Sequence, residues 1–238
     1  MKLYVYCLVD NTQTLPESLH GILGVLVRRL EIGDFSFLVS DFSDRTVPVT
    51  RENALAHAAV IQSVLKETTP LPFRFGTLVN GQQLENYVSA RSEALRSKLE
   101  QVRGCVEMNV KIISDRDWME EPQASETQAK PGTAFLSEKR REILGGEARA
   151  ARAKQVAEWL KDQVAPVAKQ TQIETLPTGK MLVTAAHLIE YERVEEFRKR
   201  VTEARHQRVD LHFLLSGPWA PYSFAHMDLE FETHFGVS

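Results

Sequence analysis

The sequence predicts an α+β protein of two ferredoxin-like (split βαβ) domains with antiparallel sheets, a long connecting helical segment and a C-terminal extension. Short β-rich apolar runs alternate with amphipathic helical stretches in the first half, and the second half repeats a shorter version of this order. The predicted divisions are an elaborated N-terminal domain at residues 1–119, a polar linker at 120–132, a helical segment with the second domain at 133–217, and the extension at 218–238.

The first domain follows the order β-α-β-β-α-β-α-β. The run LYVYCLV at residues 3–9 is apolar on both alternating faces, which is typical of a central strand covered on both sides. Apolar residues at helical spacing predict a helix over residues 17–30, although Gly21 and Gly24 weaken it. The other strands are expected at residues 35–42, 46–50, 71–79 and 105–114, and the other helices at 51–65 and 81–103.

Two patterns predict which faces of these elements are buried. Thr50 is expected to cap the helix that follows it. The inner face of that helix would carry Ala54, His57, Ala58, Ile61, Val64 and Leu65. The stretch CVEMNVKIIS alternates cleanly and predicts a half-buried strand, with Val106, Met108, Val110 and Ile112 on one face and Glu107, Asn109 and Lys111 on the other.

The second half begins after a polar segment. Residues 120–132 contain few large apolar side chains and cannot offset their ordering entropy, so a connection is expected there. Residues 134–164 are helical in composition, and the EKRRE cluster within them mixes signs, which favours a solvated helix face over a nucleic-acid site. Paired strands at 169–177 and 179–189, a helix at 190–204 and a strand at 209–216 complete the second domain.

The composition is that of an ordinary folded chain. Of its 238 residues, 43% are hydrophobic and 26% are charged. Lys and Arg number 29 against 32 Asp and Glu, so the net charge of −3 provides no attraction to nucleic acid or anionic lipid. Cys7 and Cys105 are too few for a disulfide framework, so a reducing cytoplasm fits best. Asp10 interrupts the first apolar run early, so neither a membrane span nor a signal peptide is expected.

Motifs of catalysis are absent from the sequence, whether for phosphate binding, dinucleotide binding, zinc proteolysis or serine hydrolysis. No nucleophile accompanies His57, so it is expected to be a hydrogen-bonded core residue and not a catalytic one. In HMDLEFETHF, His226 and His234 could bind a cation with the acidic residues between them, but an amphipathic strand explains the alternation more simply. No catalytic, cofactor-binding or metal-binding residue is therefore predicted.

The stretch LPFRFGTLV places an arginine between two phenylalanines and then a glycine. In a strand, Arg74 points away from Phe73 and Phe75, toward a helix-covered face where its guanidinium needs a carboxylate or several carbonyls. Gly76 permits a bulge or the close approach of another backbone. A structural use of these residues is favoured over ligand binding.

This stretch, preceded by His57 in ALAHAAVIQSVL, and the stretch SGPWAPYSFA resemble the two best-marked segments of the gas vesicle GvpL/GvpF family. LYVYCLV, GCVEMNVKI, GTAFLSEKRRE and MLVTAAHLIEYERVEEFRKRV support the match in order, so the resemblance spans almost the whole chain. Ala220 departs from the family pattern, which usually has a second proline in GPWPPYSF. The resemblance also implies two ferredoxin-like domains with a C-terminal extension.

The resemblance further implies a non-catalytic protein of the gas vesicle, inside the cytoplasm of a prokaryote. It implies an assembly or minor structural role during nucleation, with the hydrophobic shell protein GvpA and other accessory Gvp proteins as partners and no nucleic acid, membrane, cofactor or small-molecule ligand. Shell subunits expose apolar areas before assembly, and such surfaces aggregate unless they are covered. The candidate structural or partner-binding residues are His57, Arg74, Phe75, Gly76, Gly217, Pro218, Trp219, Pro221, Tyr222 and Phe224.

Other interpretations remain open. Trp219, Tyr222 and Phe224 are either anchors for a partner or a strap buried within the chain, and the internal strap is favoured because large aromatics usually bury in their own chain. The alternative function is a ligand-sensing or regulatory module that holds a small molecule between paired sheets. RNA binding is disfavoured by the net acidity and the missing RNP-like signature. A cation-dependent hydrolase is the least supported hypothesis.

Overall fold

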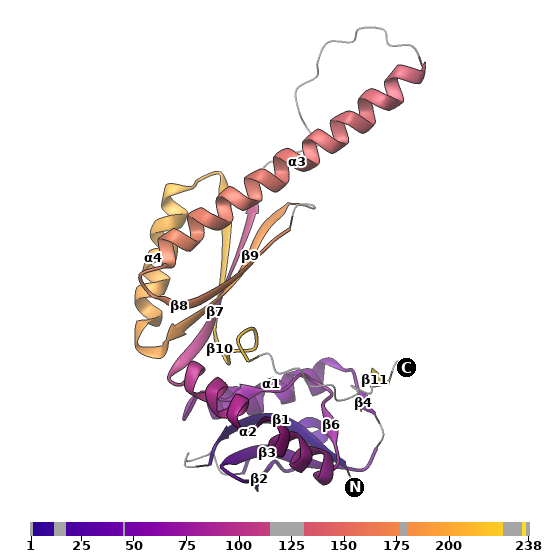
Figure 1. Ribbon diagram of the computed structural model, residues 1–238, viewed down its shortest axis with the longest axis vertical. Helices are drawn as coiled ribbons and strands as arrows, with labels where there is room; N and C mark the ends of the chain where they lie inside the picture. Colours follow the sequence, from indigo (N-terminus) through magenta and orange to yellow (C-terminus); the bar gives the residue numbers. More distant parts are fainter. Residues whose placement is uncertain are drawn as a thin grey trace. The chain divides into compact units, whose positions relative to one another are not determined.

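The structure is a computed structural model that describes residues 2–11, 18–44, 46–114, 131–176, 180–225 and 235–236. These residues form two antiparallel sheets, a small strand pair and four α-helices, so the α+β class is confirmed (Figure 1). The chain forms two compact units. One consists of Met1–Glu107 together with Pro218–Ser238, and the other of Met108–Gly217.

The sheet of the first unit is built around β1 (Lys2–Asp10). The strand order is β2-β3-β1-β5, with β6 also paired to β1. Residues 3–9 of β1 are buried throughout, as expected for a central strand. The other strands of this unit are β2 (Arg28–Ile32), β3 (Phe35–Phe42), β4 (Val47–Pro48), β5 (Leu71–Pro72), β6 (Leu78–Val79) and β11 (Phe235–Gly236), which pairs with β4.

The helix expected at residues 17–30 is wrong. The structure has a hairpin at residues 19–27, whose tip is the short 3-10 turn η1 (Ile22–Gly24), and then strand β2. Two backbone hydrogen bonds close the hairpin, from Gly21 to Val25 and from Val27 to Leu19, each 2.8 Å. Leu23 and Gly24 have positive φ values of 53° and 70°, which a helix does not allow. Leu23 and Leu26, which fall at helical spacing in the sequence, are exposed in this hairpin, so the spacing does not mark a buried helix face here.

Two helices belong to the first unit, α1 (Arg51–Leu65) and α2 (Gly81–Val102). The Thr50 side chain accepts a hydrogen bond from the Asn53 amide, so the predicted cap is confirmed. The buried face of α1 differs from the prediction, because Ala54 and Ala58 are exposed while Asn53, His57, Val60, Ile61 and Val64 are buried. The Asn53 side chain sets this rotation: it donates to the Pro48 carbonyl at 3.0 Å and accepts from the Leu23 amide at 3.3 Å.

The second unit contains a four-stranded sheet with the order β10-β7-β9-β8. Its elements are β7 (Cys105–Ser114), α3 (Pro131–Val164), β8 (Ala168–Thr175), β9 (Met181–Glu190), the 3-10 turn η2 (Tyr191–Arg193), α4 (Val194–Gln207) and β10 (Leu211–Trp219). The strand at 105–114 was expected in the sheet of the first domain, but it lies between β10 and β9 here. Of the expected linker, residues 120–130 lie outside the described residues, and α3 begins at Pro131.

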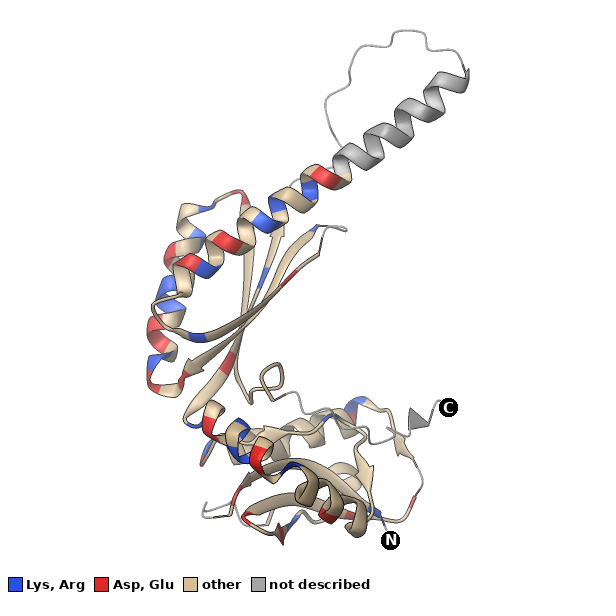
Figure 2. Cartoon of the chain, in the orientation of Figure 1, with Lys and Arg blue, Asp and Glu red and all other residues tan. Residues whose placement is uncertain are grey.

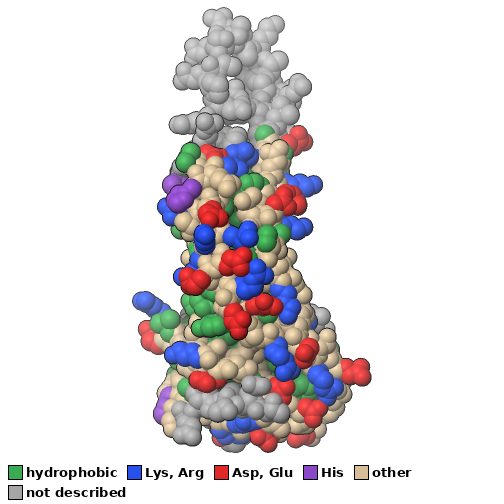
Figure 3. All heavy atoms as spheres, turned by 90° about the vertical axis from the view of Figure 1, so that its left-hand side faces the viewer, with side chains coloured by type: hydrophobic (Ala, Val, Ile, Leu, Met, Phe, Trp, Pro, Cys, Tyr) green, Lys and Arg blue, Asp and Glu red, His purple; other side chains and the backbone are tan. Residues whose placement is uncertain are grey.

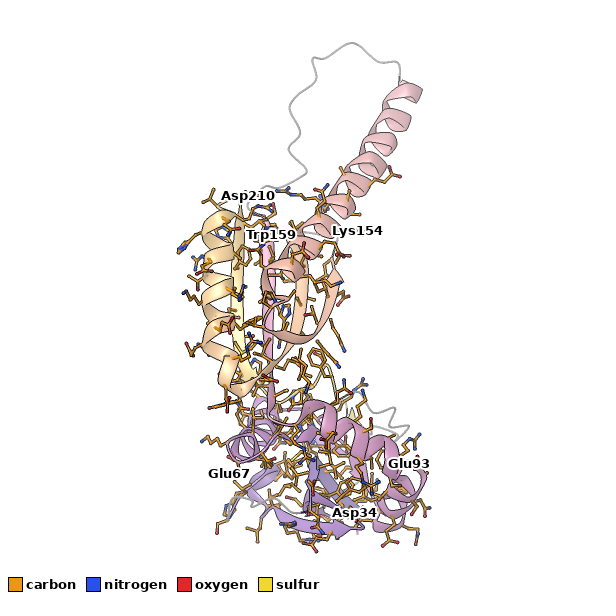
Figure 4. All side chains as sticks on the ribbon, turned by 60° about the vertical axis from the view of Figure 1, so that its left-hand side comes forward. Asp34, Glu67, Glu93, Lys154, Trp159 and Asp210 are labelled. Atoms are coloured by element: carbon orange, nitrogen blue, oxygen red, sulfur yellow. The ribbon has the colours of Figure 1, made fainter. Side chains whose placement is uncertain are left out.

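A polar and aromatic cluster fastens the start of β10 to α3 in this unit. The Arg208 guanidinium lies 5.3 Å from the centre of the Trp159 ring, and that ring packs edge-on against Phe213. Asp210 accepts hydrogen bonds from Arg208 at 2.8 Å and from Arg152 at 2.6 Å. Figure 4 shows Trp159 and Asp210 at the same end of the unit. The Arg208 guanidinium holds the pKa of Asp210 well below its usual range.

Replacing this carboxylate tests how much the cluster contributes. Asp210→Asn should lower the free energy of unfolding by about 0.5–1 kcal/mol, because the pair is half exposed and screened by solvent. Urea unfolding at low and high salt measures the loss, which should shrink with salt. Glu203→Gln on α4 is the control, since its contact with Lys199 spans 4.0 Å on an exposed face. Equal effects of the two substitutions would contradict a special role for the cluster.

The surface carries both signs of charge throughout the described part of the chain. Along α4, Lys and Arg are interspersed with Glu (Figure 2). Four ion pairs join residues three or four positions apart, and one of them begins at Arg193 in the preceding turn η2. The face drawn in Figure 3 likewise shows blue and red side chains interleaved without a region of one sign. Among the described residues, no helix is long and apolar enough to cross a membrane.

Candidate partner-binding site

The segment at residues 71–79 is two short strands with a bulge between them, and not the single strand that was expected. Both strands pair with β1 in the antiparallel sense, Leu71 with Leu8 and Val79 with Leu3. The two pairs are five residues apart on β1 but eight residues apart on the segment 71–79, so this segment has three extra residues that form the bulge. Hydrogen bonds from the Phe73 amide to Tyr6 and from the Val5 amide to Thr77 mark the two sides of the bulge.

The bulge is closed by a turn from Arg74 to Thr77. The Thr77 amide and hydroxyl both donate to the Arg74 carbonyl, at 3.3 and 2.7 Å. Gly76 has a φ of +86° at the third position of this turn, where a type II turn requires a positive φ. A residue with a side chain would be strained there, which explains the glycine.

Arg74 does not lie on a helix-covered face. Its side chain is exposed on the turn, because the bulge breaks the alternation that would have placed it inward. Phe75 is half-buried and packs edge-on against Tyr4 and His57, with ring centres 6.3 and 5.8 Å apart. Phe73 is buried and contacts Phe37. The arginine therefore needs no buried carboxylate.

A buried hydrogen-bond chain holds the bulge in place. His57 on α1 contacts the Phe73 carbonyl through Nε2 at 3.2 Å and the Tyr4 hydroxyl through Nδ1 at 2.8 Å. A carbonyl can only accept, so Nε2 carries the hydrogen and Nδ1 accepts from Tyr4. The Tyr4 oxygen in turn accepts from the Gly76 amide at 3.2 Å. Every hydrogen is used when His57 is neutral, and burial lowers its pKa from 6.5 to about 4.

A second buried chain holds the hairpin at residues 19–27. The Ile22 amide donates to the Tyr6 hydroxyl at 3.0 Å. Tyr6 then donates to Ser40 at 3.1 Å, and Ser40 donates to the Leu26 carbonyl at 3.1 Å. Tyr4 and Tyr6 thus both point to one face of β1 and use their hydroxyls to satisfy backbone groups of irregular segments. The sequence pattern marks both as apolar strand residues and does not show these partners.

Residues 218–225 form what we call the C-terminal strap, which packs on the first unit. Ala220, Pro221, Phe224 and Ala225 are buried, and Ala220 joins the core cluster that contains Tyr4, Tyr6 and residues of α1. Pro221 is at the centre of a tight turn in which the Tyr222 amide donates to the Ala220 carbonyl at 2.8 Å. The Ala225 amide donates back to Pro221, also at 2.8 Å. The fixed φ of Pro221 and the small side chain of Ala220 suit this tight backbone turn.

Three side chains of the first unit fix the strap. Gln62 of α1 donates to the Pro218 carbonyl at 2.9 Å, and Lys98 of α2 donates to the Phe224 carbonyl at 3.4 Å. The Glu107 carboxylate accepts from the Ser223 amide at 2.7 Å and from its hydroxyl at 3.0 Å. Glu107 was expected on a solvated face, but it is buried because the strap covers that end of β7. Glu107 thus holds the strap in place, a role that the alternation of residues 105–114 did not show.

Removing the Glu107 charge should loosen the strap. Glu107→Gln leaves an amide facing two donors, so we expect the free energy of unfolding to fall by about 2 kcal/mol. Urea unfolding measures this loss, and faster proteolysis within residues 218–225 would locate it. Ser223→Ala, which keeps the bond to the amide, should cost about half as much. A Glu107→Gln variant as stable and as protease-resistant as the wild type would contradict this role of the carboxylate.

The remaining candidate residues lie along the strap or, in the case of Gly217, directly before it. Gly217, at the end of the second unit, has a φ of +117°, and its carbonyl accepts from Arg198 at 3.1 Å. Trp219 is 44% exposed and Tyr222 is 38% exposed, whereas Phe224 is buried. The structure thus brings His57, Phe75 and Gly76 into one network and places the strap residues in another, while the exposed Arg74 side chain lies on the turn that contains Gly76.

The site therefore consists of hydrogen-bonded backbone and exposed aromatic rings. Among the described residues, no group of three His, Cys, Asp or Glu side chains could hold a metal ion. The expected cation row at residues 226–234 lies outside them. These features define a class of α+β protein whose irregular segments are held by buried hydrogen bonds.

Comparisons with known proteins agree with this class. The family model described as gas vesicle synthesis protein GvpL/GvpF matches residues 2–226, so the chain belongs to the GvpL/GvpF family. This is a family of structural and assembly proteins and not of enzymes, and its members act together with other gas vesicle proteins.

Three relatives match over almost their full length. Gas vesicle protein F1 of Halobacterium salinarum is 24% identical, covering 99% of this chain and 98% of that protein. Gas vesicle protein F of Dolichospermum flosaquae is 26% identical over 96% and 99%, and gas vesicle protein L of a Streptomyces species is 26% identical over 93% and 92%.

Solved structures share the fold. The crystal structure of GvpF from an Anabaena species has a TM-score of 0.78 at 24% identity, covering 100% of this chain and 99% of that one. GvpF from Microcystis aeruginosa has a TM-score of 0.74 at 24% identity, with 95% and 99% coverage.

Proposed function

We propose that this chain is an assembly or minor structural protein of gas vesicles that binds the hydrophobic shell protein GvpA and other accessory Gvp proteins during nucleation. Its place of action is the gas vesicle, inside the cytoplasm of a prokaryote. Family membership supports the gas vesicle role. The contact with GvpA is supported by chemistry, because a shell subunit that exposes apolar surface before assembly needs a soluble partner to cover it.

One observation carries the proposal to particular residues. Trp219 and Tyr222 expose part of their rings on a strap whose backbone is fixed by Gln62, Lys98 and Glu107. Rings held in this way bind with little loss of side-chain or backbone entropy, and Trp and Tyr are enriched among binding hot spots. Phe224, which lies in the core, anchors the strap from below.

The second unit supports a finer description of the fold. Its order β7-α3-β8-β9-α4-β10 and its strand order β10-β7-β9-β8 are those of a split βαβ arrangement. We therefore propose a ferredoxin-like topology for this unit. The first unit has strands β2, β3, β5 and β6 around β1, so an elaborated version would have to accommodate an additional hairpin and bulge.

The test is complementation in a gas-vesicle-forming host that lacks the gene. Tagged wild-type protein should restore vesicles and co-purify with GvpA, whereas Trp219→Ala/Tyr222→Ala should fold normally and lose both. Leu214→Ala, a change at another exposed apolar residue at 55% exposure, is the matched control and should behave like the wild type. Vesicles that form normally without the gene, with no GvpA captured by the wild type, would overturn the proposal.

A further inference from the structure

The turn at residues 74–77, which we call the Arg74 turn, exposes one charged side chain. Arg74 is exposed, whereas Phe75 is half-buried and the two residues after it are buried. Pairing with β1 resumes at Leu78, so the bulge does not end the strand. A bulge inside a continuing ladder typically redirects a side chain. The side chain that this bulge directs into solvent is an arginine.

The backbone on both sides of this arginine is fixed by buried groups. His57 donates to the Phe73 carbonyl directly before Arg74, and the Gly76 amide donates to the Tyr4 hydroxyl oxygen. The Arg74 carbonyl accepts two more hydrogen bonds within the turn, at 3.3 and 2.7 Å. A guanidinium on such a backbone loses less entropy on binding than one on a mobile loop, because the main chain is already ordered.

The Arg74 turn and the C-terminal strap are both neighbours of Tyr4. The turn donates an amide hydrogen to the Tyr4 oxygen at 3.2 Å. Burial raises the pKa of Tyr4 above its usual range, and the nearby Tyr222 phenol adds to this rise. Phe75 of the turn and Ala220 of the strap also pack against the same core cluster. The charged turn and the exposed rings of the strap therefore belong to adjoining parts of the first unit.

The chemistry of the guanidinium indicates a carboxylate as its ligand. Its N–H groups form a planar fork that matches the two oxygens of an Asp or Glu side chain. A nucleic acid or an anionic membrane needs several cations on one surface. This chain has a net charge of −3, and both signs are interleaved over the described residues (Figure 2). A single arginine near exposed aromatic rings therefore fits a protein partner that carries an acidic side chain within an apolar surface.

An ion pair supplies what the rings alone do not. Contact between apolar surfaces is not directional, so Trp219 and Tyr222 contribute binding energy without fixing the orientation of the partner. A charged pair beside them favours one orientation, because any other places the partner's carboxylate away from the guanidinium.

We infer that the Arg74 turn and the strap rings Trp219 and Tyr222 form one composite binding surface, in which the Arg74 guanidinium binds an Asp or Glu carboxylate of the partner. The inference rests on the proposed function, because the partner is the shell protein GvpA, and it adds the charged part of the same surface. The rings bury apolar area, and the ion pair sets the orientation in which a shell subunit is held.

Removal of the charge tests the inference. Arg74→Gln should fold like the wild type, because the side chain is exposed and the hydrogen bonds of the turn use its backbone. Co-purification of GvpA with the tagged variant at low salt should fall about tenfold. Arg74→Lys keeps the charge without the fork and should stay within about threefold of the wild type. Arg205→Gln, at an exposed position in the last turn of α4, is the matched control and should capture GvpA as the wild type does.

Salt distinguishes an ion pair from a structural role of Arg74. Capture by the wild type should weaken between about 0.1 M and about 0.5 M sodium chloride, because the added ions screen the pair. Capture by Arg74→Gln should change much less over this range. A variant that captured less GvpA only because its turn was distorted would keep the salt dependence of the wild type, and that result would contradict the inference.

The outcomes also separate this inference from the proposed function. Capture of GvpA by the wild type and undiminished capture by folded Arg74→Gln would overturn the inference alone. No capture by the wild type would overturn both. Retention of the wild type on immobilised RNA, lost in Arg74→Gln, would also overturn the inference, since a polyanion would then be the ligand of the guanidinium.

Discussion

Gly21→Ala should destabilise the protein by about 3 kcal/mol or more, the largest effect expected of any single methyl group here. A Cβ at this position would lie 1.7 Å from the Tyr6 hydroxyl oxygen and 2.4 Å from the ring carbon that bears it. Tyr6 is fully buried, so its ring cannot swing into solvent. Either the hairpin or the tyrosine must move. Each movement breaks the hydrogen bonds that link the Ile22 amide, the Tyr6 hydroxyl and the Ser40 hydroxyl.

Gly81→Ala provides the control for this prediction. Nothing lies within 4 Å of a Cβ built on Gly81, and the residue is the first of α2, where alanine is the better helix former. We expect this variant to be as stable as the wild type or slightly more stable. Thermal and urea unfolding of both variants measure the difference. A Gly21→Ala protein within about 1 kcal/mol of the wild type would show that the hairpin moves freely, against the structure.

Acid should destabilise the protein between pH 6.5 and pH 4 because two histidines are buried in their neutral form. His57 is hydrogen-bonded to the Tyr4 hydroxyl and to the Phe73 carbonyl. His187 of β9 packs against the Phe197 ring, and its Nδ1 is hydrogen-bonded to the Thr171 hydroxyl. Burial lowers the pKa of each to about 4, from 6.5 when exposed.

The sign follows from proton binding. Between pH 6.5 and 4 the unfolded chain binds more protons than the folded one, so stability falls as the pH falls through this window. The contribution is fully present above pH 6.5. From pH 7 to pH 5, each histidine should account for a loss of about 2 kcal/mol.

Melting temperatures across this pH range test the assignment. His57→Gln should lower stability at pH 7, because the bond pattern with Tyr4 and Phe73 is disturbed, but it should remove about half of the fall toward pH 5. His206→Gln, at an exposed position near the end of α4, should leave the pH profile unchanged. If His57→Gln shows the same fall as the wild type, the acid sensitivity must come from other groups.

The regular elements were predictable from the sequence because their signals are local. The Thr50 cap, the start of α2 at Gly81 and the doubly buried β1 all follow from residues within one element. The hairpin at residues 19–27 was not predictable in this way. Its shape depends on the hydroxyl of Tyr6, which lies in another strand and reads as an apolar residue in the pattern.

The local structure of the candidate residues was only partly predictable. The two stretches that carry the resemblance contain the bulge and the strap, but their partners are distant in sequence. The alternation of 105–114 placed Glu107 opposite Val106 without showing that residues 218–225 would cover it, a separation of more than a hundred residues. Arg74 was placed wrongly because three extra residues in the bulge break the period of two.

Because the strap belongs to the first unit but comes last in the sequence, it affects the order in which the two units can fold during translation. The second unit is one continuous stretch, Met108–Gly217, and all of it leaves the ribosome before Ala220 and Phe224 do. The first unit is translated earlier, yet it lacks two pieces of its own core until these residues emerge. During translation, the second unit can therefore complete its fold before the first unit can. The core of the first unit is therefore complete only after residue 225 has been translated.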